Sequence, residues 1–98
     1  MQDYEVEWEM DALQDRANHY KYLHENASEN VADSVDNKIQ EAANNLAILP
    51  YSGKAVSDGM EGRTLYVTGT RYLIYYVVSQ SSKAIKILRI FHSRQRHP

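Results

Sequence analysis

AIKILRIFHSRQRHP, residues 84–98, is the stretch of sequence that decides the fold. Its first half is filled by bulky and β-branched apolar residues, which is typical of a strand buried on both faces. Arg89 interrupts the apolar run, His92 closes it, and Arg94 and Arg96 follow in a basic tail. Because a cation within an apolar strand costs free energy unless it is paired or meets water in a cleft, this strand is expected to carry part of the core and part of the working surface.

The residues before this strand predict two more strands and the turns that join them. Residues 72–78, YLIYYVV, are apolar throughout and are expected to form the central strand. Residues 63–68 predict another strand, which Gly69-Thr70 turns towards the central one. Residues 79–82 are polar and are expected to form a hairpin loop, so the last three strands should make an antiparallel meander.

The N-terminal half predicts one strand and two helices. Residues 4–9 alternate apolar and acidic side chains, the period of a strand at a sheet edge. A helical pattern follows this strand and is interrupted at residues 25–28, which divide it into two helices. Asn26 or Ser28 can cap the second helix. The apolar stripes are Met10, Leu13, Ala17, Tyr20 and His24 in the first helix, and Val31, Val35, Ile39, Ala42, Leu46 and Leu49 in the second.

The connection between helices and sheet is a loop over residues 50–62. Pro50 ends the second helix, Lys54 is the only cation of the loop, and three glycines are expected to give it backbone freedom. The resulting order is β-α-α-β-β-β. It predicts a single α+β domain, residues 1–98, in which the helical hairpin packs on one face of a small antiparallel sheet.

Composition narrows the class of protein further. The chain has 98 residues and no cysteine, so disulfides and thiolate metal sites are excluded. His19 and His24 are spaced by five, which does not align two metal ligands on one helix face, and we expect neither a metal nor a cofactor. No segment approaches the roughly 20 apolar residues of a membrane span, and the acidic N-terminus lacks a signal peptide, so a cytoplasmic protein without a membrane partner is expected.

Charge is distributed unevenly along the chain. Residues 1–50 contain eleven acids and three cations, whereas residues 51–98 contain eight cations and two acids. Halves of opposite sign suggest a basic face for an anionic partner. The alternative is that the two halves neutralise each other across the fold.

The basic residues of the C-terminal half are the candidate binding site. Clustered cations can grip phosphates or acidic side chains, and the candidates are Arg63, Arg89, His92, Arg94 and Arg96. Arg89 is the most specific because of its apolar flanks, although it can equally be a half-buried arginine paired with one of the N-terminal acids.

His92 is the candidate acid–base residue, because an ordinary histidine pKa lies near ~6.5. It can equally be a cap or a packing residue at a strand end. Arg89 and His92 are three residues apart, so in a regular strand they face opposite sides. They can share one site only if the strand bulges or ends before His92, which counts against a joint catalytic role.

The chain resembles the ParE/RelE superfamily of bacterial toxins over nearly its whole length. The resemblance rests on the helical hairpin ending in LAILPYSGK, the Gly62-Arg63-Thr64-Leu65 entry to the sheet, the TRYLIYYVV strand, and ILRIFHSRQ followed by a terminal proline. The ending ILRIFHSRQRHP, in which a leucine-arginine pair precedes a histidine three residues after the arginine, resembles the ParE branch more than the RelE branch.

This resemblance implies the toxin of a type II toxin–antitoxin pair. A cognate antitoxin would lie along it in an extended or helical form and block it, in a hetero-oligomer. ParE-type relatives act on DNA gyrase, whereas RelE-type relatives enter the ribosome and cut mRNA. The residues expected to contact the target or the antitoxin are Arg63, Arg89, His92, Arg94 and Arg96.

Two departures from the RelE pattern favour gyrase inhibition by binding. Arg63 and Arg89 match the family's sheet arginines and His92 matches its end-of-strand histidine, but the lysine-rich loop of RelE-type nucleases is reduced to Lys54. RNA cleavage needs a base, an acid and a cation, and only His92 is an obvious proton-transfer group. Ribosome-dependent mRNA cleavage by His92, Arg63 and Arg89 is the alternative, and a relative that binds only its antitoxin is a third reading.

Overall fold

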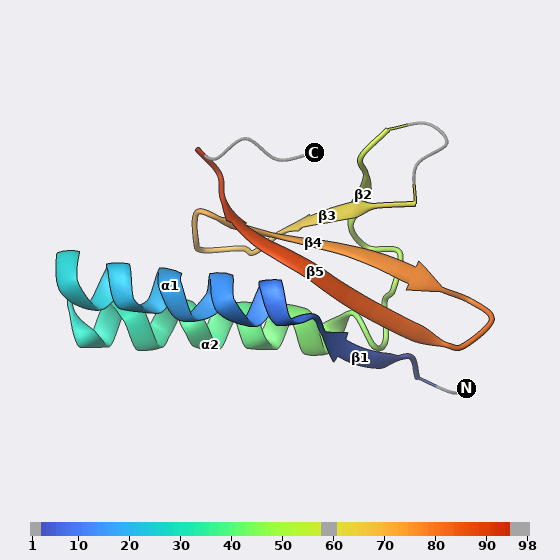
Figure 1. Cartoon of the computed structure of the whole chain (residues 1–98), viewed down its shortest axis with the longest axis horizontal. Helices are drawn as coiled ribbons and strands as arrows, with labels where there is room; N and C mark the ends of the chain where they lie inside the picture. Colours follow the sequence, from blue (N-terminus) through green and yellow to red (C-terminus); the bar gives the residue numbers. More distant parts are fainter. Residues whose placement is uncertain (1–2, 58–60, 95–98) are drawn as a thin grey trace.

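The structure is a computed structural model that describes residues 3–57 and 61–94, and within them two helices lie on one side of a sheet (Figure 1). The predicted α+β architecture is confirmed. In chain order the elements are β1 (Glu5–Trp8), α1 (Met10–Asn26), α2 (Glu29–Asn45), β2 (Lys54–Ala55), β3 (Arg63–Tyr66), β4 (Tyr72–Ser79) and β5 (Ala84–His92).

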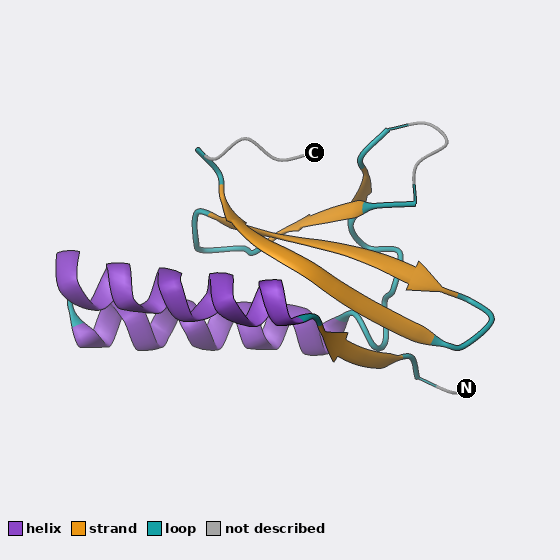
Figure 2. Ribbon diagram, viewed as in Figure 1, coloured by secondary structure: helices purple, strands orange, loops and turns teal. Residues whose placement is uncertain are grey.

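The sheet is mixed, with the strand order β1-β5-β4-β3-β2 (Figure 2). The meander of β3, β4 and β5 is antiparallel and β4 is central, as predicted. The expectation of a purely antiparallel sheet is wrong, because β1 pairs in parallel with β5, from Glu5 opposite Ala84 to Trp8 opposite Ile87. A parallel pair needs a long crossover, and the helical hairpin lies within the connection between these two strands.

The helical hairpin is joined by polar contacts between α1 and α2. The Ser28 hydroxyl caps α2 by accepting the N–H of Val31 at 3.1 Å. Arg16 donates to both carboxylate oxygens of Asp36, at 2.7 and 2.9 Å. The Tyr20 hydroxyl donates to a carboxylate oxygen of α2 at 2.7 Å, which raises the pKa of Tyr20 to about 12.

No helix within the described residues is long and apolar enough to cross a membrane.

The buried face of α1 differs from the predicted stripe. Ala12 is fully buried and Leu23 packs against the core, whereas Met10 and Leu13 are 77% and 43% exposed. The reason is that α1 lies along β5 and presents polar side chains to it, which a search for apolar periodicity does not register. The α2 stripe is confirmed at its centre, where Ile39 and Leu46 are buried, and its ends are exposed.

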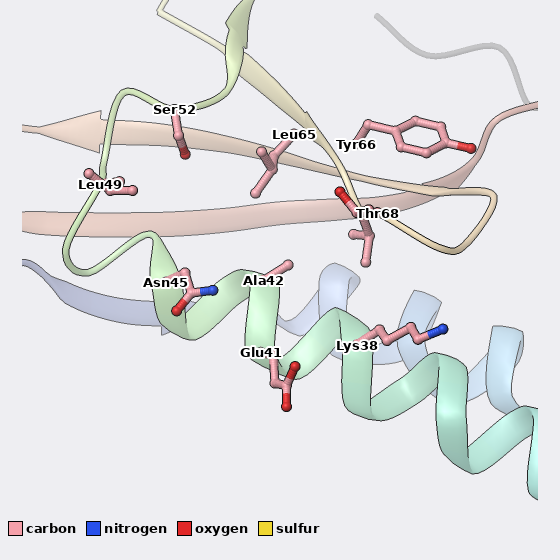
Figure 3. Close-up of a pocket in the computed structure, with 10 residues that line it drawn as sticks. Lys38, Glu41, Ala42, Asn45, Leu49, Ser52, Leu65, Tyr66 and Thr68 are labelled. Carbon is pink, nitrogen blue, oxygen red and sulfur yellow. The ribbon is translucent and has the colours of Figure 1, made fainter.

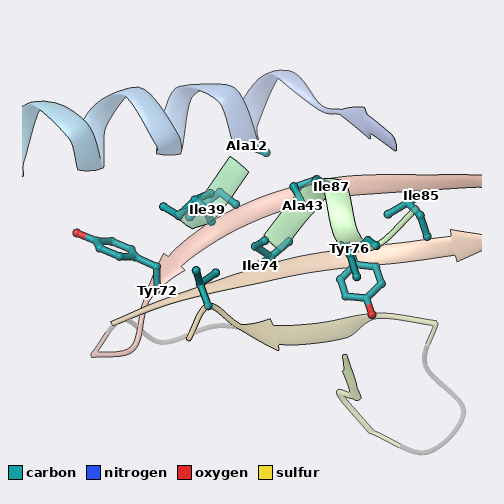
Figure 4. Packing of buried hydrophobic residues seen from close by; sticks show 11 residues of the cluster. Ala12, Ile39, Ala43, Tyr72, Ile74, Tyr76, Ile85 and Ile87 are labelled. Carbon is teal, nitrogen blue, oxygen red and sulfur yellow. The ribbon is translucent and has the colours of Figure 1, made fainter. Parts of the chain in front are cut away.

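The core lies between the hairpin and the helix-facing side of β4 and β5 (Figure 4). Tyr76 is its largest fully buried side chain. Its hydroxyl accepts the N–H of Gly53 at 2.8 Å and donates to the carbonyl of Pro50 at 2.9 Å, so the core also fixes the loop after α2. Other members of the core are Ala12, Ile39, Ala43, Leu46, Val67, Tyr72, Ile74, Ile85, Ile87 and Ile90.

Two glycines of this loop are required for space rather than for backbone freedom. A Cβ on Gly53 would meet the ring of Tyr76, and a Cβ on Gly62 would meet the ring of Tyr75. Because neighbouring residues of a strand point to opposite faces, the loop is held against both faces of β4. Among the described glycines, positive φ occurs at Gly69, in the turn between β3 and β4.

Candidate functional site

Arg89 lies in β5 and is held by Asp15 of α1. Its Nε donates to Oδ2 of Asp15 at 2.7 Å, and its Nη2 donates to Oδ1 at 2.9 Å. The Arg89 side chain remains 43% exposed, whereas the Asp15 side chain is 14% exposed. Of the two alternatives that the sequence left open for Arg89, pairing with an N-terminal acid is therefore the one that the structure shows.

The same helix covers the edge of β5 beyond the reach of β1. The pairing with β1 ends at Ile87, and three residues later the Ile90 N–H donates to Oδ2 of Asp15 at 2.9 Å. The Ile90 carbonyl lies 2.8 Å from Nε2 of His19. Because a carbonyl only accepts, Nε2 of His19 is the donor in this contact. Asp15 and His19, one helical turn apart, thus take the place of a neighbouring strand.

The electrostatics of Asp15 follow from these contacts. Burial by itself raises the pKa of the carboxyl group, but the hydrogen bonds from Arg89 and from the Ile90 N–H, with the charge of Arg89, outweigh it. The pKa of Asp15 therefore lies below its ordinary value. Its hydrogen bond to Asp15 raises the pKa of Arg89, so the pair is fully ionised at neutral pH.

A β-bulge precedes Arg89 rather than separating it from His92. Arg89 pairs with Tyr75 and Ile87 pairs with Tyr76, so Leu88 is the extra residue. After the bulge the strand alternates regularly, which places Arg89 and His92 on opposite faces.

His92 belongs to an aromatic cluster on the helix side of the sheet. Its ring meets the ring of Tyr72 edge to face, with the centroids 5.2 Å apart, and Tyr72 in turn packs on His19 at 4.7 Å. Nδ1 of His92 accepts the N–H of Arg94 at 3.1 Å. Together with Tyr22, these four residues line an open cleft of about 410 Å³, here called the terminal cleft.

The terminal cleft is cationic at its rim. Partial burial lowers the pKa of His92, and electrostatic interactions with Arg94, His19 and Arg71 lower it further. The imidazole is therefore neutral at pH 7 and able to accept a proton. Arg94 is exposed beside it, whereas Arg96 lies outside the described residues.

Arg63 holds the loop that follows α2. Its Nη1 donates to the carbonyl of Gly53 at 2.7 Å, and its guanidinium lies 4.9 Å from the ring centroid of Tyr51. Lys54, the next residue of this loop, is exposed in β2. Arg63 therefore has a structural task in addition to any contact with a target.

The structure brings together only part of the predicted constellation. Arg63 pairs with Tyr76 and Arg89 pairs with Tyr75, and these neighbours on β4 point to opposite faces. The two arginines therefore do not share a face, whereas His92 and Arg94 share the terminal cleft. Within residues 3–57 and 61–94, no group of three His, Asp or Glu side chains is placed to hold a metal ion.

Sequence reasoning missed Asp15, His19 and Tyr72 as partners of the candidate residues. The four-residue spacing of Asp15 and His19 on a predicted helix was a usable signal, because it places two polar groups on one face. What the sequence did not contain was the register that sets this face against Ile90.

The sequence matches the family described as ParE toxin of type II toxin-antitoxin system, parDE, over residues 6–97. The chain belongs to the ParE toxin family. It is thus a type II toxin, and the predicted resemblance to the ParE branch is confirmed. No curated protein matches the sequence.

Solved structures show the same fold at low sequence identity. A chain of the chromosomal ParDE system from P. aeruginosa superposes with a TM-score of 0.77 and 21% identity, covering 91% of this chain and 95% of that one. The RelBE2 toxin–antitoxin complex from Mycobacterium tuberculosis gives 0.65 at 20% identity, with 92% and 98% covered. The isolated RelE toxin of E. coli gives 0.56 at 12% identity, with 96% and 88% covered.

Proposed function

We propose that this ParE-family chain, acting as one toxin domain over residues 1–98, inhibits DNA gyrase in the cytoplasm by binding to it. A cognate antitoxin neutralises the toxin in a hetero-oligomer. The observation that carries the proposal is the separation of the candidate nuclease residues. Arg63 and Arg89 lie on opposite faces of the sheet, and His92 lies on the face opposite to Arg89.

The separation of the candidate nuclease residues favours inhibition by binding, because RNA cleavage requires several groups at one phosphate. A base near the 2′-hydroxyl, an acid near the leaving oxygen and a cation near the phosphorane must all lie within hydrogen-bond reach of one phosphate. Here Arg89 is engaged by Asp15 and Arg63 by the loop at Gly53. Inhibition by binding needs no such convergence, only a surface.

The terminal cleft is the surface that we assign to the target. Arg94 is exposed there beside a neutral His92, and Arg71 adds a second positive charge to its field. The aromatic rings of Tyr22 and Tyr72 give it an apolar floor. Arginine next to aromatic rings is the composition that dominates binding energy at protein interfaces.

Ribosome-dependent mRNA cleavage is the second candidate, and one observation favours it. The pKa of His92 is lowered, so its imidazole can take up a proton at pH 7, and Arg94 in the same cleft can hold a phosphate. In this case His92→Ala abolishes toxicity while the fold is unchanged. In the leading proposal His92→Ala retains most of it.

The antitoxin proposal is supported by exposed apolar surface. Met10, Ile48, Leu49 and Tyr51 are large side chains that are 44% to 77% exposed. Grouped exposed apolar residues mark sites of protein association. Ile48, Leu49 and Tyr51 lie together around one hollow at the end of α2, so this region is a natural place for a partner.

Two assays run side by side test the proposal. Purified toxin is added to gyrase and relaxed plasmid, and in parallel to a translation extract with a labelled mRNA. We expect loss of supercoiling or trapped cleaved DNA, and intact mRNA. Active gyrase together with cut mRNA would reverse the order of the two candidates.

A further inference from the structure

The short segment that follows β5 is held in place by two hydrogen bonds of its backbone. The N–H of Ser93 donates to the carbonyl of Arg71 at 2.7 Å, and the N–H of Arg94 donates to Nδ1 of His92 at 3.1 Å. The first bond joins the segment to the residue before β4, and the second joins it to the last residue of β5. The backbone of Arg94 is therefore fixed beside the terminal cleft that its side chain lines.

The rings of the terminal cleft are packed against one another. Tyr72 is 3% exposed and contacts both His19 of α1 and His92 of β5, with centroid distances of 4.7 and 5.2 Å. Nε2 of His19 also bonds to the carbonyl of Ile90 at 2.8 Å, which ties α1 to β5. The walls of the cleft come from elements that are already joined, as in a preformed binding site.

The terminal cleft is lined by an arginine and by no acid. Among the described residues that line it there is neither Asp nor Glu, and the cation is Arg94. Arg71 interacts electrostatically with His92 from the turn before β4, so a second guanidinium contributes to the field. An anion is the ligand that this arrangement attracts.

Two other hollows differ from the terminal cleft in the charges that line them. The groove between β3 and α2, about 320 Å³ in volume, has both Lys38 and Glu41 on its helix side (Figure 3). The hollow at the start of α1 is lined by two acids, Glu9 and Asp11. An incoming anion meets an acid in both of these hollows. Of the three, the terminal cleft is therefore the one suited to an anion.

A single carboxylate suits the terminal cleft better than the phosphates of a nucleic acid strand. The two helices, residues 10–26 and 29–45, contain seven acids and three lysine or arginine residues. A nucleic acid carries a charge at every nucleotide, so its phosphates on either side of the cleft would be repelled by the helices. A carboxylate between uncharged residues avoids this repulsion. Its apolar neighbour can pack on the ring of Tyr22, which is 59% exposed.

We propose that the terminal cleft binds an aspartate or glutamate side chain of the target, with Arg94 as its charged partner and Tyr22 packed on the adjacent residue. This inference rests on the proposed function, because it takes the cleft as the surface that meets the target. A guanidinium can hold a carboxylate through two parallel hydrogen bonds, which gives the contact a direction as well as strength.

Two short blocked peptides that differ in one residue test the chemistry of the site. Each carries a leucine next to either glutamate or glutamine, and each is titrated into the whole toxin while NMR follows the ring of His92 and the amide of Arg94. We expect the glutamate peptide to bind at least about tenfold more tightly. Arg94→Gln should remove this difference. Lys86→Gln should keep it, since Lys86 is an exposed cation of β5 that does not line the cleft.

Three results would count against the inference or limit it. Equal affinity for the two peptides, or no saturable shift with either, overturns it and leaves gyrase inhibition to its own assay. A single-stranded oligothymidylate is titrated in parallel, and tighter binding of this probe than of the glutamate peptide would assign the cleft to nucleic acid instead. If the glutamate peptide binds through Arg94 while gyrase stays active in the presence of the toxin, the carboxylate site stands and gyrase is not its partner.

Discussion

The carboxylate of Asp15 holds the guanidinium of Arg89 through two hydrogen bonds, 2.7 and 2.9 Å long, across 74 residues of sequence. The same carboxylate accepts the N–H of Ile90. Arg89, the cation that interrupts the apolar run of the sequence, therefore helps to connect α1 to β5. The pairing fixes the position of the Arg89 guanidinium and leaves 43% of the side chain exposed.

Removing the carboxylate of Asp15 should destabilise the fold more than neutralising it. Asp15→Ala leaves the Ile90 N–H without an acceptor and should lower the free energy of unfolding by about 2–3 kcal/mol. Asp15→Asn keeps an acceptor oxygen, and since Arg89 is partly exposed the loss should be about 1 kcal/mol or less. Urea unfolding measures both. Equal losses in the two variants would show that the Ile90 contact contributes nothing.

Stability should also depend on pH through Asp15. Its pKa in the folded state is below the ordinary value of 3.8, because the contacts of Arg89 and the Ile90 N–H exceed the opposing effect of burial. The ionised carboxylate therefore stabilises the fold above pH 3.8, and this contribution is lost as the pH falls through the lower, folded-state pKa.

The measurement is the difference in unfolding free energy between the parent chain and Asp15→Asn at a series of pH values. This difference in unfolding free energy should be constant at neutral pH and should shrink as the pH falls below 3.8. A difference that is unchanged in strong acid would mean that it does not arise from ionisation.

Much of this architecture was predictable from local pattern. Alternating side chains in residues 4–9 and the apolar run of residues 72–78 predicted an edge strand and the central strand, and both are found. The parallel pairing of β1 with β5 was missed, because a strand's partner depends on the path of the chain and not on the strand's own sequence.

The candidate site was predictable only in part for a related reason. Any of eleven acids in the first half of the chain was a possible partner for Arg89, and composition does not single out Asp15. The opposite orientation of Arg89 and His92 followed from their spacing, since the bulge at Leu88 lies outside the interval between them.

Gly62 should not tolerate a side chain while Tyr75 is present. A Cβ there would lie 2.6 Å from the Tyr75 hydroxyl oxygen, and overpacking of this kind costs about 1–3 kcal/mol. We expect Gly62→Ala to be destabilised by that amount in thermal unfolding. In a Tyr75→Leu background the same change should cost much less, and an undiminished cost there would place the strain elsewhere.

Charge reversal in the terminal cleft should weaken the effect on gyrase. Arg94→Glu should raise the toxin concentration for half-inhibition of supercoiling by about tenfold, because a cation at an interface is replaced by an anion. Lys86→Glu is the matched control, since Lys86 is an exposed cation on β5, the strand that precedes Arg94, and does not line the cleft. Equal losses in the two variants would indicate a response to net charge alone.

The dose dependence of inhibition tests the central claim, action by binding, most directly. Supercoiling by a fixed amount of gyrase is measured against increasing toxin, and mRNA integrity is followed in a translation extract over the same range. A binding inhibitor titrates its target, so we predict that inhibition saturates at about one toxin per gyrase site while the mRNA stays intact. Complete mRNA cleavage at far less than one toxin per ribosome, with gyrase unaffected, would contradict the account.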